Sequence, residues 1–486
     1  MSGLAPLVLE LDPPPDPLDC CSRCLGLPFL VFLDSAATSD RLGRYSFLSG
    51  DPAVVVRSKG ERTERWTSAA GTWESIAEDP LEFVRATLLR EHAAVAIPDL
   101  PPFQGGAAGY IGYEWGARLE RIAPPRFDDL GIPDCMLGWY DWVIAWDHQL
   151  RRAWLISTGL PETGPARSRR AAERQALICA LLAGERRPPP SPSRVSARNA
   201  AQAASPPLYP FAAGIRSTFT RSGYCDAVRR VVDYLFAGDI FQANLSHRMQ
   251  SRLAEPPFDL YRRLRRHNPA PFAAYLDFGE VVVASSSPER FLHASSDTRV
   301  VEARPIKGTR PRGHGPDDDA ALRQELIESE KDRAEHIMIV DVLRNDLSRV
   351  CRPGSVRVPE LFALEQYATV HHLVSTVVGE LAPDRDVVDL LRATFPGGSI
   401  TGAPKIRAMQ IIAELEPTGR GVYCGSIGYV SVTGALDTSI VIRTYLVLGE
   451  DVYFQVGGGV VADSDPEQEY RETLDKARGL IAALIT

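Results

Sequence analysis

The stretch at residues 300–310 reads VVEARPIKGTR and places one lysine, Lys307, between an apolar segment and a glycine. The valines that begin it predict a strand that ends before Pro305. Gly308 and Thr309 then predict a short turn whose backbone a small substrate can reach. Most lysines are solvated surface residues, so a functional role for Lys307 depends on evidence from other segments of the chain.

Three of those segments offer acid–base or anion-binding groups. Glu289 follows the apolar run VVVA at 281–284, which places a carboxylate at a predicted strand end. The segment 395–405, FPGGSITGAPK, predicts a loop that enters a helix at Ile406, and backbone amides at such an entrance suit an anion. The triple glycine at 457–459 weakens a predicted strand and therefore indicates close approach of a ligand.

Glutamates on two predicted helices form a further feature. Glu335 begins a predicted helix, where a carboxylate also has a purely structural reason to lie. In the terminal helix Glu469, Glu472 and Lys476 fall at i, i+3 and i+7 and so share one face. A solvated, salt-bridged surface would show the same pattern. The alternative is that Glu335 and Glu472 bind a hard cation such as Mg²⁺ together with an anionic substrate.

Length and charge exclude several classes of protein. The chain has 486 residues and a net charge of -8, which predicts two or three domains and argues against nucleic-acid binding. No run of about 18 apolar residues predicts a transmembrane helix. The acidic, proline-rich start does not resemble a secretory signal. We therefore expect a cytoplasmic protein that binds neither nucleic acid nor a membrane.

Eight cysteines are too scattered in so long a chain to predict a disulfide framework. Cys20, Cys21 and Cys24 lie together, but no second Cys or His pair completes a zinc site. The run at Cys24 faintly resembles the nucleophile turn of glutamine amidotransferases. It lacks the flanking strand–turn–helix pattern and a downstream His-x-Glu, so the sequence argues against that activity.

The chain divides at a predicted linker. Residues 1–186 are strand-rich, with an aromatic strand predicted at 138–142 and a helix over about 161–186. Residues 187–210 are rich in Pro, Ala and Ser and predict a flexible linker. Residues 211–486 open with a helix-start signal at Thr220 and then alternate strands and helices irregularly, which predicts an α+β domain.

Residues from about 218 to 485 resemble the chorismate-binding domain shared by anthranilate, aminodeoxychorismate, isochorismate and salicylate synthases. The N-terminal region, 1–186, resembles the matching region of the anthranilate and aminodeoxychorismate members through 33–35, 43–51 and 105–113. The resemblance implies an α+β chorismate-utilising fold, with two large packed β-sheets and helices outside (α/β/β/α). In the catalytic part it rests on the segments 287–291, 305–309, 334–349, 395–411, 423–429, 442–444 and 456–478.

The resemblance also assigns roles by position. Glu335 and Glu472 match ligands of Mg²⁺, with Glu469 one turn away in support. His372 and Ser399 match positions near the departing hydroxyl, where many relatives have threonine in place of Ser399. Such a site fits a dicarboxylate, because Arg, Lys, backbone amides and Mg²⁺ all bind carboxylate oxygens. The matching substrate-binding residues are Gly308, Thr309, Tyr423, Arg443, Gly457, Gly458, Gly459 and Lys476.

Lys307 and Gln242 decide which reaction the resemblance implies. Aminodeoxychorismate enzymes typically have lysine at the position of Lys307, whereas anthranilate synthases typically have alanine. Gln242 stands where the water-using members have an activating lysine. The resemblance therefore implies that Lys307 adds to C2 of chorismate, that Glu289 acts as general acid and then base, and that ammonia adds at C4 and expels the lysine. The product would be 4-amino-4-deoxychorismate, a precursor of p-aminobenzoate and folate.

Two other functions stay open at this point. One is anthranilate synthesis by the same domain. The other is a non-catalytic regulatory relative that binds tryptophan, although the intact Lys307, Glu335, Glu472 and Arg443 argue against it. The residues that match the family's tryptophan pocket are Ser35, Arg44, Tyr45, Ser46, Pro271 and Phe272.

Ammonia is scarce at neutral pH because ammonium dominates in water. The chain has no credible glutaminase of its own, so the resemblance implies a separate glutamine amidotransferase subunit that supplies the ammonia. We therefore expect a heterodimer of this chain with such a subunit.

Overall fold

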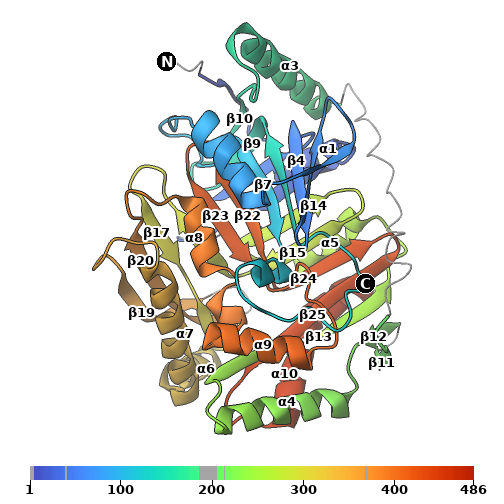
Figure 1. The fold of residues 1–486 in the computed structure, drawn as a ribbon, viewed down its shortest axis with the longest axis vertical. Helices are drawn as coiled ribbons and strands as arrows, with labels where there is room; N and C mark the ends of the chain where they lie inside the picture. Colours follow the sequence, from blue (N-terminus) through green and yellow to red (C-terminus); the bar gives the residue numbers. More distant parts are fainter. Residues whose placement is uncertain (1–4, 39–40, 185–204, 213, 367–369, 486) are drawn as a thin grey trace.

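Two antiparallel β-sheets packed face to face form the body of the protein (Figure 1). The computed structural model describes residues 5–38, 41–184, 205–212, 214–366 and 370–485. Side chains from both sheets meet in one buried layer, for example Val143 and Val283 from the first sheet with Tyr110 and Met136 from the second. The predicted α+β architecture with two large packed sheets is therefore confirmed.

The first sheet has 13 strands in the order β1-β10-β9-β3-β2-β14-β15-β24-β25-β13-β12-β11, with β21 paired to β13. Its strands are β1 Leu7–Glu10, β2 Leu30–Asp34, β3 Tyr45–Ser49, β9 Trp142–Asp147, β10 Arg152–Ser157, β11 Tyr209–Ala212, β12 Ile215–Ser217, β13 Gln242–Arg252, β14 Phe272–Asp277, β15 Val282–Ser287, β21 Gly402–Ala403, β24 Thr444–Leu448 and β25 Asp451–Val460.

The second sheet has 12 strands in the order β18-β20-β17-β16-β23-β22-β7-β8-β4-β5-β6, with β19 paired to β20. Its strands are β4 Val54–Lys59, β5 Arg62–Thr67, β6 Trp73–Ile76, β7 Gly106–Ile111, β8 Cys135–Tyr140, β16 Arg290–Ala294, β17 Val300–Ala303, β18 Ile306–Pro311, β19 Arg357–Gln366, β20 Val370–Glu380, β22 Ser426–Ser431 and β23 Leu436–Ile440.

Helices cover the outer faces of the two sheets (Figure 1). In the lower half of the view α9 (Lys405–Leu415) lies against β13 and α10 (Pro466–Ile485) lies against β25, whereas α7 (Glu330–Ser348) lies to their left beside β20. The α-helices are α1 Pro17–Cys24, α2 Pro80–Val84, α3 Gly164–Leu182, α4 Arg221–Phe236, α5 Pro257–His267, α6 Pro316–Glu328, α7 Glu330–Ser348, α8 Val387–Thr394, α9 Lys405–Leu415 and α10 Pro466–Ile485. The shorter helical turns are η1 Arg85–Glu91, η2 Tyr113–Arg118 and η4 Gly398–Ile400.

Both sheets combine strands from the two halves of the chain. In the first sheet β2 pairs with β14, so that Leu33 lies opposite Ala274. In the second sheet β7 pairs with β22, so that Ala108 lies opposite Tyr429. The N-terminal region therefore completes the sheets of the C-terminal region. Residues 187–204 of the predicted linker, 187–210, lie outside the described residues. Its last two residues, 209 and 210, belong to β11.

The sequence predicts one aromatic strand at 138–142, and this prediction was wrong. The chain leaves the second sheet at Tyr140, the end of β8, and enters the first at Trp142, the start of β9. Asp141 at the crossing is fully buried and is neutralised by Arg170 and Arg174 of α3. Both strands are buried along their whole length, so apolar residues continue on both sides of the crossing. The sequence pattern therefore gives no sign of where one strand ends and the next begins.

Local helix signals are better predictors here. Thr220 caps α4 by accepting the backbone N–H of Gly223, and the helix follows as predicted. The helix expected over about 161–186 is present as α3. No helix in the described part of the chain is long and apolar enough to span a membrane.

Candidate active site

Lys307 lies in a bulged strand and not in the predicted turn. Strand β18 pairs with β20, and its register shifts between Ile306 and Thr309, so the ladder is interrupted around Lys307. Gly308 has a φ of +84°, and a Cβ there would lie 2.9 Å from Leu326 Cδ1 of α6. The turn prediction was wrong because the strand resumes after the glycine, and the positive φ and the close Leu326 show that the local geometry needs a glycine here.

The ammonium of Lys307 faces the carboxylate of Glu335 on α7. Nζ lies 2.7 Å from Oε1, and the side chains are only 12% and 13% exposed. The buried amide of Gln242 in β13 donates to the same oxygen. The prediction that Glu335 begins its helix was wrong, because α7 begins at Glu330 after the capping Ser329. The helix N-terminus therefore does not explain why a carboxylate is buried at this position.

Helix α10 brings a second carboxylate group against the glycine-rich strand β25. Lys476 Nζ lies 2.6 Å from Glu472 Oε1 and donates to the Gly457 carbonyl at 2.9 Å. A Cβ at Gly458 would lie 3.2 Å from Glu469 Oε2 and 3.4 Å from Glu472 Oε1. The three charged residues thus share one face of α10, as their spacing predicts, and the glycines let them approach the strand.

Gly459 connects this group with the first one. A Cβ at Gly459 would lie 2.0 Å from Gln242 Nε2 and 2.6 Å from Glu335 Oε1. Adjacent residues of one strand, Gly458 and Gly459, therefore contact carboxylates from two different helices. Glu335 and Glu472, which are far apart in sequence, are brought to the same wall of the site.

The chemistry of these carboxylates fits a hard cation. Glu469 Oε2 is buried and has no hydrogen-bond partner among the described residues. Burial, and next the charge of Glu472, raise the pKa of Glu469, and a cation would relieve both effects. Oxygen donors of this kind suit Mg²⁺, which keeps several waters. Within the described ranges, however, no group of three or more His, Cys, Asp or Glu is arranged to hold a metal ion. Glu335 and Glu472 are instead neutralised by Lys307 and Lys476.

Glu289 is buried immediately before β16, with 5% of its surface exposed. Burial raises the pKa of Glu289 from 4.5 to about 7, against the opposing effects of a hydrogen bond from Ser399, the charge of Lys307 and the backbone N–H of Ile306. A carboxyl that titrates near neutral pH can both donate and accept a proton. The structure thus brings the predicted acid–base residue beside both the predicted nucleophile and Ser399.

His372 and Thr309 lie opposite each other on β20 and β18. Thr309 Oγ1 is 2.9 Å from His372 Nδ1. Burial, helped by the charge of Arg443, lowers the pKa of His372 to about 4. The imidazole is therefore neutral at neutral pH, so it can take part in hydrogen bonds without adding positive charge.

Arg443 offers a guanidinium for an anionic group. Its Nη1 donates to the Lys476 carbonyl at 2.6 Å, and no carboxylate of the described chain lies within ion-pair distance of it. Burial lowers the pKa of Arg443, and the nearby Tyr423 opposes that effect. A partly buried guanidinium without a carboxylate partner is suited to bind an anionic ligand.

One buried ion pair of the site was missed by the sequence analysis. Lys405 Nζ lies 2.6 Å from Asp346 Oδ2 and donates to the Thr394 carbonyl at 2.8 Å. The pair ties α7 to the start of α9 and so fixes the loop that carries Ser399. Asp346 lies about three helical turns after Glu335, on the same face of α7. That spacing is the signal that could have predicted it.

None of the cysteines is suited to act as a nucleophile in this site. All eight are free thiols in the structure. Cys24 is fully buried in α1, and burial raises the pKa of its thiol to about 12. A buried thiol of this kind is a poor nucleophile, which agrees with the absence of a glutaminase motif around it.

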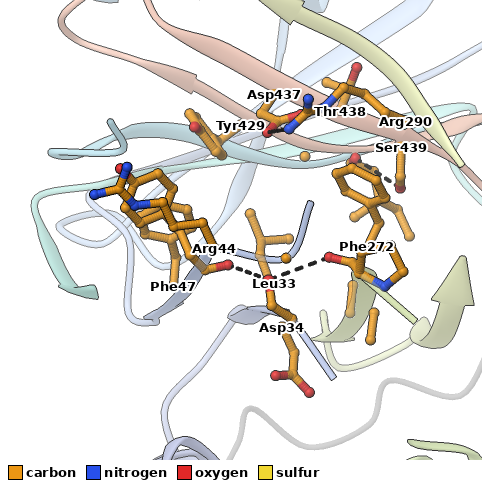
Figure 2. A pocket seen from close by; sticks show the side chains of 18 of the residues that line it. Leu33, Asp34, Arg44, Phe47, Phe272, Arg290, Tyr429, Asp437, Thr438 and Ser439 are labelled. Atoms are coloured by element: carbon orange, nitrogen blue, oxygen red, sulfur yellow. Dashed lines mark hydrogen bonds and ion pairs between the residues drawn. The ribbon is translucent and has the colours of Figure 1, made fainter. Parts of the chain in front are cut away.

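A separate cavity of about 270 Å³ lies between the two sheets (Figure 2). Leu33 and Phe47 from the first sheet face Tyr429 and Thr438 from the second. Ser46, expected in the same pocket, does not line it: its hydroxyl accepts the backbone N–H of Ser35 at 2.9 Å. The other expected residues of the tryptophan pocket line the cavity, namely Ser35, Arg44, Tyr45, Pro271 and Phe272.

Comparison with known proteins indicates one family for this chain. Residues 33–482 match the family described as chorismate binding enzyme. The aminodeoxychorismate synthase component 1 of Salmonella typhimurium is 40% identical over 100% of this chain and 99% of its own length. The anthranilate synthase component 1 of Thermus thermophilus is 44% identical over 80% of this chain and 79% of its own.

A solved structure shows the same architecture. Anthranilate synthase component I from Streptococcus pneumoniae superposes with a TM-score of 0.74 and 32% identity, over 91% of this chain and 93% of that one. The family match spans both halves of the chain and includes every element that contributes to the site. The chain therefore belongs to the family of chorismate binding enzymes.

Proposed function

We propose that the chain aminates chorismate to 4-amino-4-deoxychorismate, using Mg²⁺ and ammonia that a glutamine amidotransferase partner supplies. One observation carries the proposal: the shielded amine of Lys307 lies beside a carboxyl, Glu289, that titrates near neutral pH. Full-length relatives named aminodeoxychorismate synthase component 1 support it, and "component 1" in that name implies a second component. The product is a precursor of p-aminobenzoate and folate.

Binding of the substrate falls to the cationic and glycine-rich parts of the site. Arg443 and Lys476 offer positive charge to the two carboxylates of chorismate. The glycines of β25 and Gly308 leave backbone groups accessible, and Thr309 adds a hydroxyl. Mg²⁺, held by Glu335 and Glu472 with Glu469 in support, would neutralise a substrate carboxylate and polarise the ring.

The first chemical step is attack by Lys307. Its amine, once deprotonated and free of Glu335, forms a bond to C2 of the ring. The ring double bonds shift, the C4–O bond breaks, and Glu289 gives its proton to the departing hydroxyl, which leaves as water. The neutral His372 and the hydroxyl of Ser399 would stabilise that hydroxyl by hydrogen bonds.

In the second step ammonia forms a bond to C4. The double bonds shift back and the bond between C2 and the lysine nitrogen breaks, which restores Lys307. Glu289, now a carboxylate, accepts the excess proton from the attacking nitrogen. The cycle consumes ammonia and chorismate, releases water, and keeps the enolpyruvyl side chain on the product.

The decisive experiment identifies the product. The purified chain is incubated with chorismate, magnesium chloride and ammonium chloride. The products are then separated by chromatography and identified by mass spectrometry. We expect 4-amino-4-deoxychorismate without release of pyruvate. Anthranilate formation would instead release pyruvate, because aromatisation expels the side chain.

Anthranilate synthesis is the second candidate, and the 44% identity to the Thermus thermophilus relative favours it. Lys307 supports amination at C4, because anthranilate synthases typically have alanine at that position. Formation of one pyruvate for each chorismate consumed would show that the chain catalyses the anthranilate reaction.

The cavity in Figure 2 supports a separate proposal, that the chain binds tryptophan. Aromatic side chains such as Phe47, Phe272 and Tyr429 suit an indole, and the hydroxyl of Ser35 and the guanidinium of Arg44 suit its polar groups. Calorimetry with L-tryptophan tests this: we expect binding that Ser35→Ala weakens. Because the catalytic residues are intact, we assign the cavity an accessory role and not the main function of the chain.

A further inference from the structure

Asn244 and Arg420, which are not among the proposed substrate-binding residues, form hydrogen bonds with the turn that carries Ser399. The amide of Asn244 in β13 donates to the Ser399 carbonyl at 3.2 Å, and its backbone N–H donates to the Thr401 carbonyl at 2.8 Å. The guanidinium of Arg420 donates to the Ile400 carbonyl at 3.1 Å. Three consecutive carbonyls of the turn are therefore held from outside it.

Arg420 is buried, and all three nitrogens of its guanidinium donate hydrogen bonds in this region. It forms a bidentate ion pair with Glu416, at 2.9 and 2.6 Å, and donates to the Asn244 carbonyl at 2.7 Å. Glu416 also accepts the backbone N–H and the hydroxyl of Ser246, at 2.8 and 2.9 Å. The ion pair is thus fully hydrogen-bonded, and its bonds bridge β13 and the Ser399 turn.

The N-terminal half of the chain fixes the position of Arg420. Glu114 of η2 accepts the backbone N–H of Arg420 at 2.6 Å and that of Gly421 at 2.8 Å. The guanidinium lies over the ring of Tyr113, 4.5 Å from its centroid. Arg420 is therefore held through its backbone, its charge and its flat face at the same time.

We propose that Asn244 and Arg420 are positioning residues that fix the Ser399 turn and keep its hydroxyl bonded to Glu289. A buried ion pair contributes little net stability compared with apolar residues of similar shape. An ion pair that directs its remaining donors at two carbonyls of the site is therefore better explained by positioning. The effect on turnover rests on the proposed function, but the effect on Glu289 does not.

A measurable consequence follows for the titration of Glu289. The hydrogen bond from Ser399 favours the charged form of Glu289, as do the charge of Lys307 and the N–H of Ile306. Cys424, whose thiol is also close, is neutral because burial raises its pKa to about 12. If the turn loosens, Glu289 loses one stabilising bond to its charged form and its pKa rises further.

The test compares Asn244→Ala with Asn268→Ala. The control removes an equivalent bond, from an asparagine amide to the Ser286 carbonyl at 3.2 Å, away from the Ser399 turn. We expect Asn244→Ala to lower kcat roughly tenfold, the usual effect of one lost hydrogen bond or slightly more. KM for chorismate should change little, and at fixed free ammonia the alkaline limb of the pH profile should move to higher pH.

A second readout is independent of activity. Isotope-edited infrared titration of the Glu289 carboxyl should show a higher pKa in Asn244→Ala and in Arg420→Lys, which keeps the charge opposite Glu416 but loses the fork. The proposal is overturned if Asn244→Ala matches Asn268→Ala in both kcat and the Glu289 titration. If the wild-type chain does not aminate chorismate, the proposed function fails, while the titration still decides whether the positioning exists.

Discussion

Lys307 Nζ lies 2.7 Å from Glu335 Oε1, and solvent reaches little of either side chain. One contact therefore joins the residue proposed as nucleophile to a residue proposed as metal ligand. An ammonium cannot attack carbon, so a lysine that acts as a nucleophile must first be neutral. The lysine must lose both this partner and a proton before it reacts, so the charge state of Glu335 bears directly on catalysis.

Removal of the charge on either proposed metal ligand should abolish turnover. Glu335→Gln and Glu472→Gln keep the size of the side chain but remove the carboxylate that a hard cation needs. We expect both variants to fold, with magnesium-dependent activity below detection and weaker binding of Mg²⁺ in calorimetry. Glu467→Gln is the matched control, because Glu467 lies on the same helix but pairs with the exposed Arg221. Full magnesium-dependent activity in both ligand variants would contradict the assignment.

Lys307→Ala should lose the 4-amino product. Without the amine no bond forms at C2, and any remaining activity should come from direct attack of free ammonia there, which gives the 2-amino isomer. Mass spectrometry of the wild-type chain, quenched during turnover, should show a substrate-derived mass on the peptide that contains Lys307. Lys59→Ala serves as control, since that lysine is 38% exposed and pairs with Asp128 and Asp134 of the N-terminal region. An undiminished rate of 4-amino product in Lys307→Ala would rule out covalent catalysis.

Glu289→Gln should slow the reaction and stabilise the protein at alkaline pH. Burial raises the pKa of Glu289 from 4.5 to about 7, so the folded state keeps a proton that the unfolded state has lost between those pH values. Stability relative to the variant is therefore unaffected below 4.5 and falls as pH rises to about 7, by on the order of 3 kcal/mol. The difference in Tm between variant and wild type should be near zero at acid pH and positive above neutrality. We expect kcat to fall roughly 100- to 10,000-fold. A Tm difference independent of pH would contradict the burial of a titrating carboxyl.

The parts of the site that lie within one helix or strand were predictable from sequence. Helical geometry is local, so the spacing of Glu469, Glu472 and Lys476 was enough to place them on one face. The triple glycine of β25 was also informative, because a strand seldom accepts such a run without a close neighbour. The role of Lys307 came from the resemblance to a family, whereas cation binding by Glu335 and Glu472 was one of two interpretations that the sequence itself left open.

The remaining features depend on contacts between distant segments. The bulge at Lys307 arises where β18 pairs with β20, a strand that begins about 60 residues later. The crossing at Asp141 requires two arginines of α3, and the bond from Arg420 to Glu114 joins residues 306 positions apart. No local pattern encodes such pairs. Without an architecture to place the segments, the Ser399 turn could be read only as an anion-binding loop.

The source of nitrogen gives the last prediction. Amination at neutral pH needs free ammonia, and among the residues that the structure describes no cysteine is suited to release it from glutamine. Cys24, the one candidate, is fully buried in α1, and burial raises the pKa of its thiol to about 12. The purified chain should therefore use ammonium salts but not glutamine.

Its rate with ammonium should rise with pH as free ammonia increases, until Glu289 loses the proton that it gives to the leaving hydroxyl. Addition of a glutamine amidotransferase subunit should confer glutamine-dependent turnover, and Cys24→Ser should change neither activity. Glutamine-dependent turnover by the chain alone, lost in Cys24→Ser, would refute the need for a partner. Such a result would also require α1 to open, because no glutamine can reach a thiol that solvent does not reach.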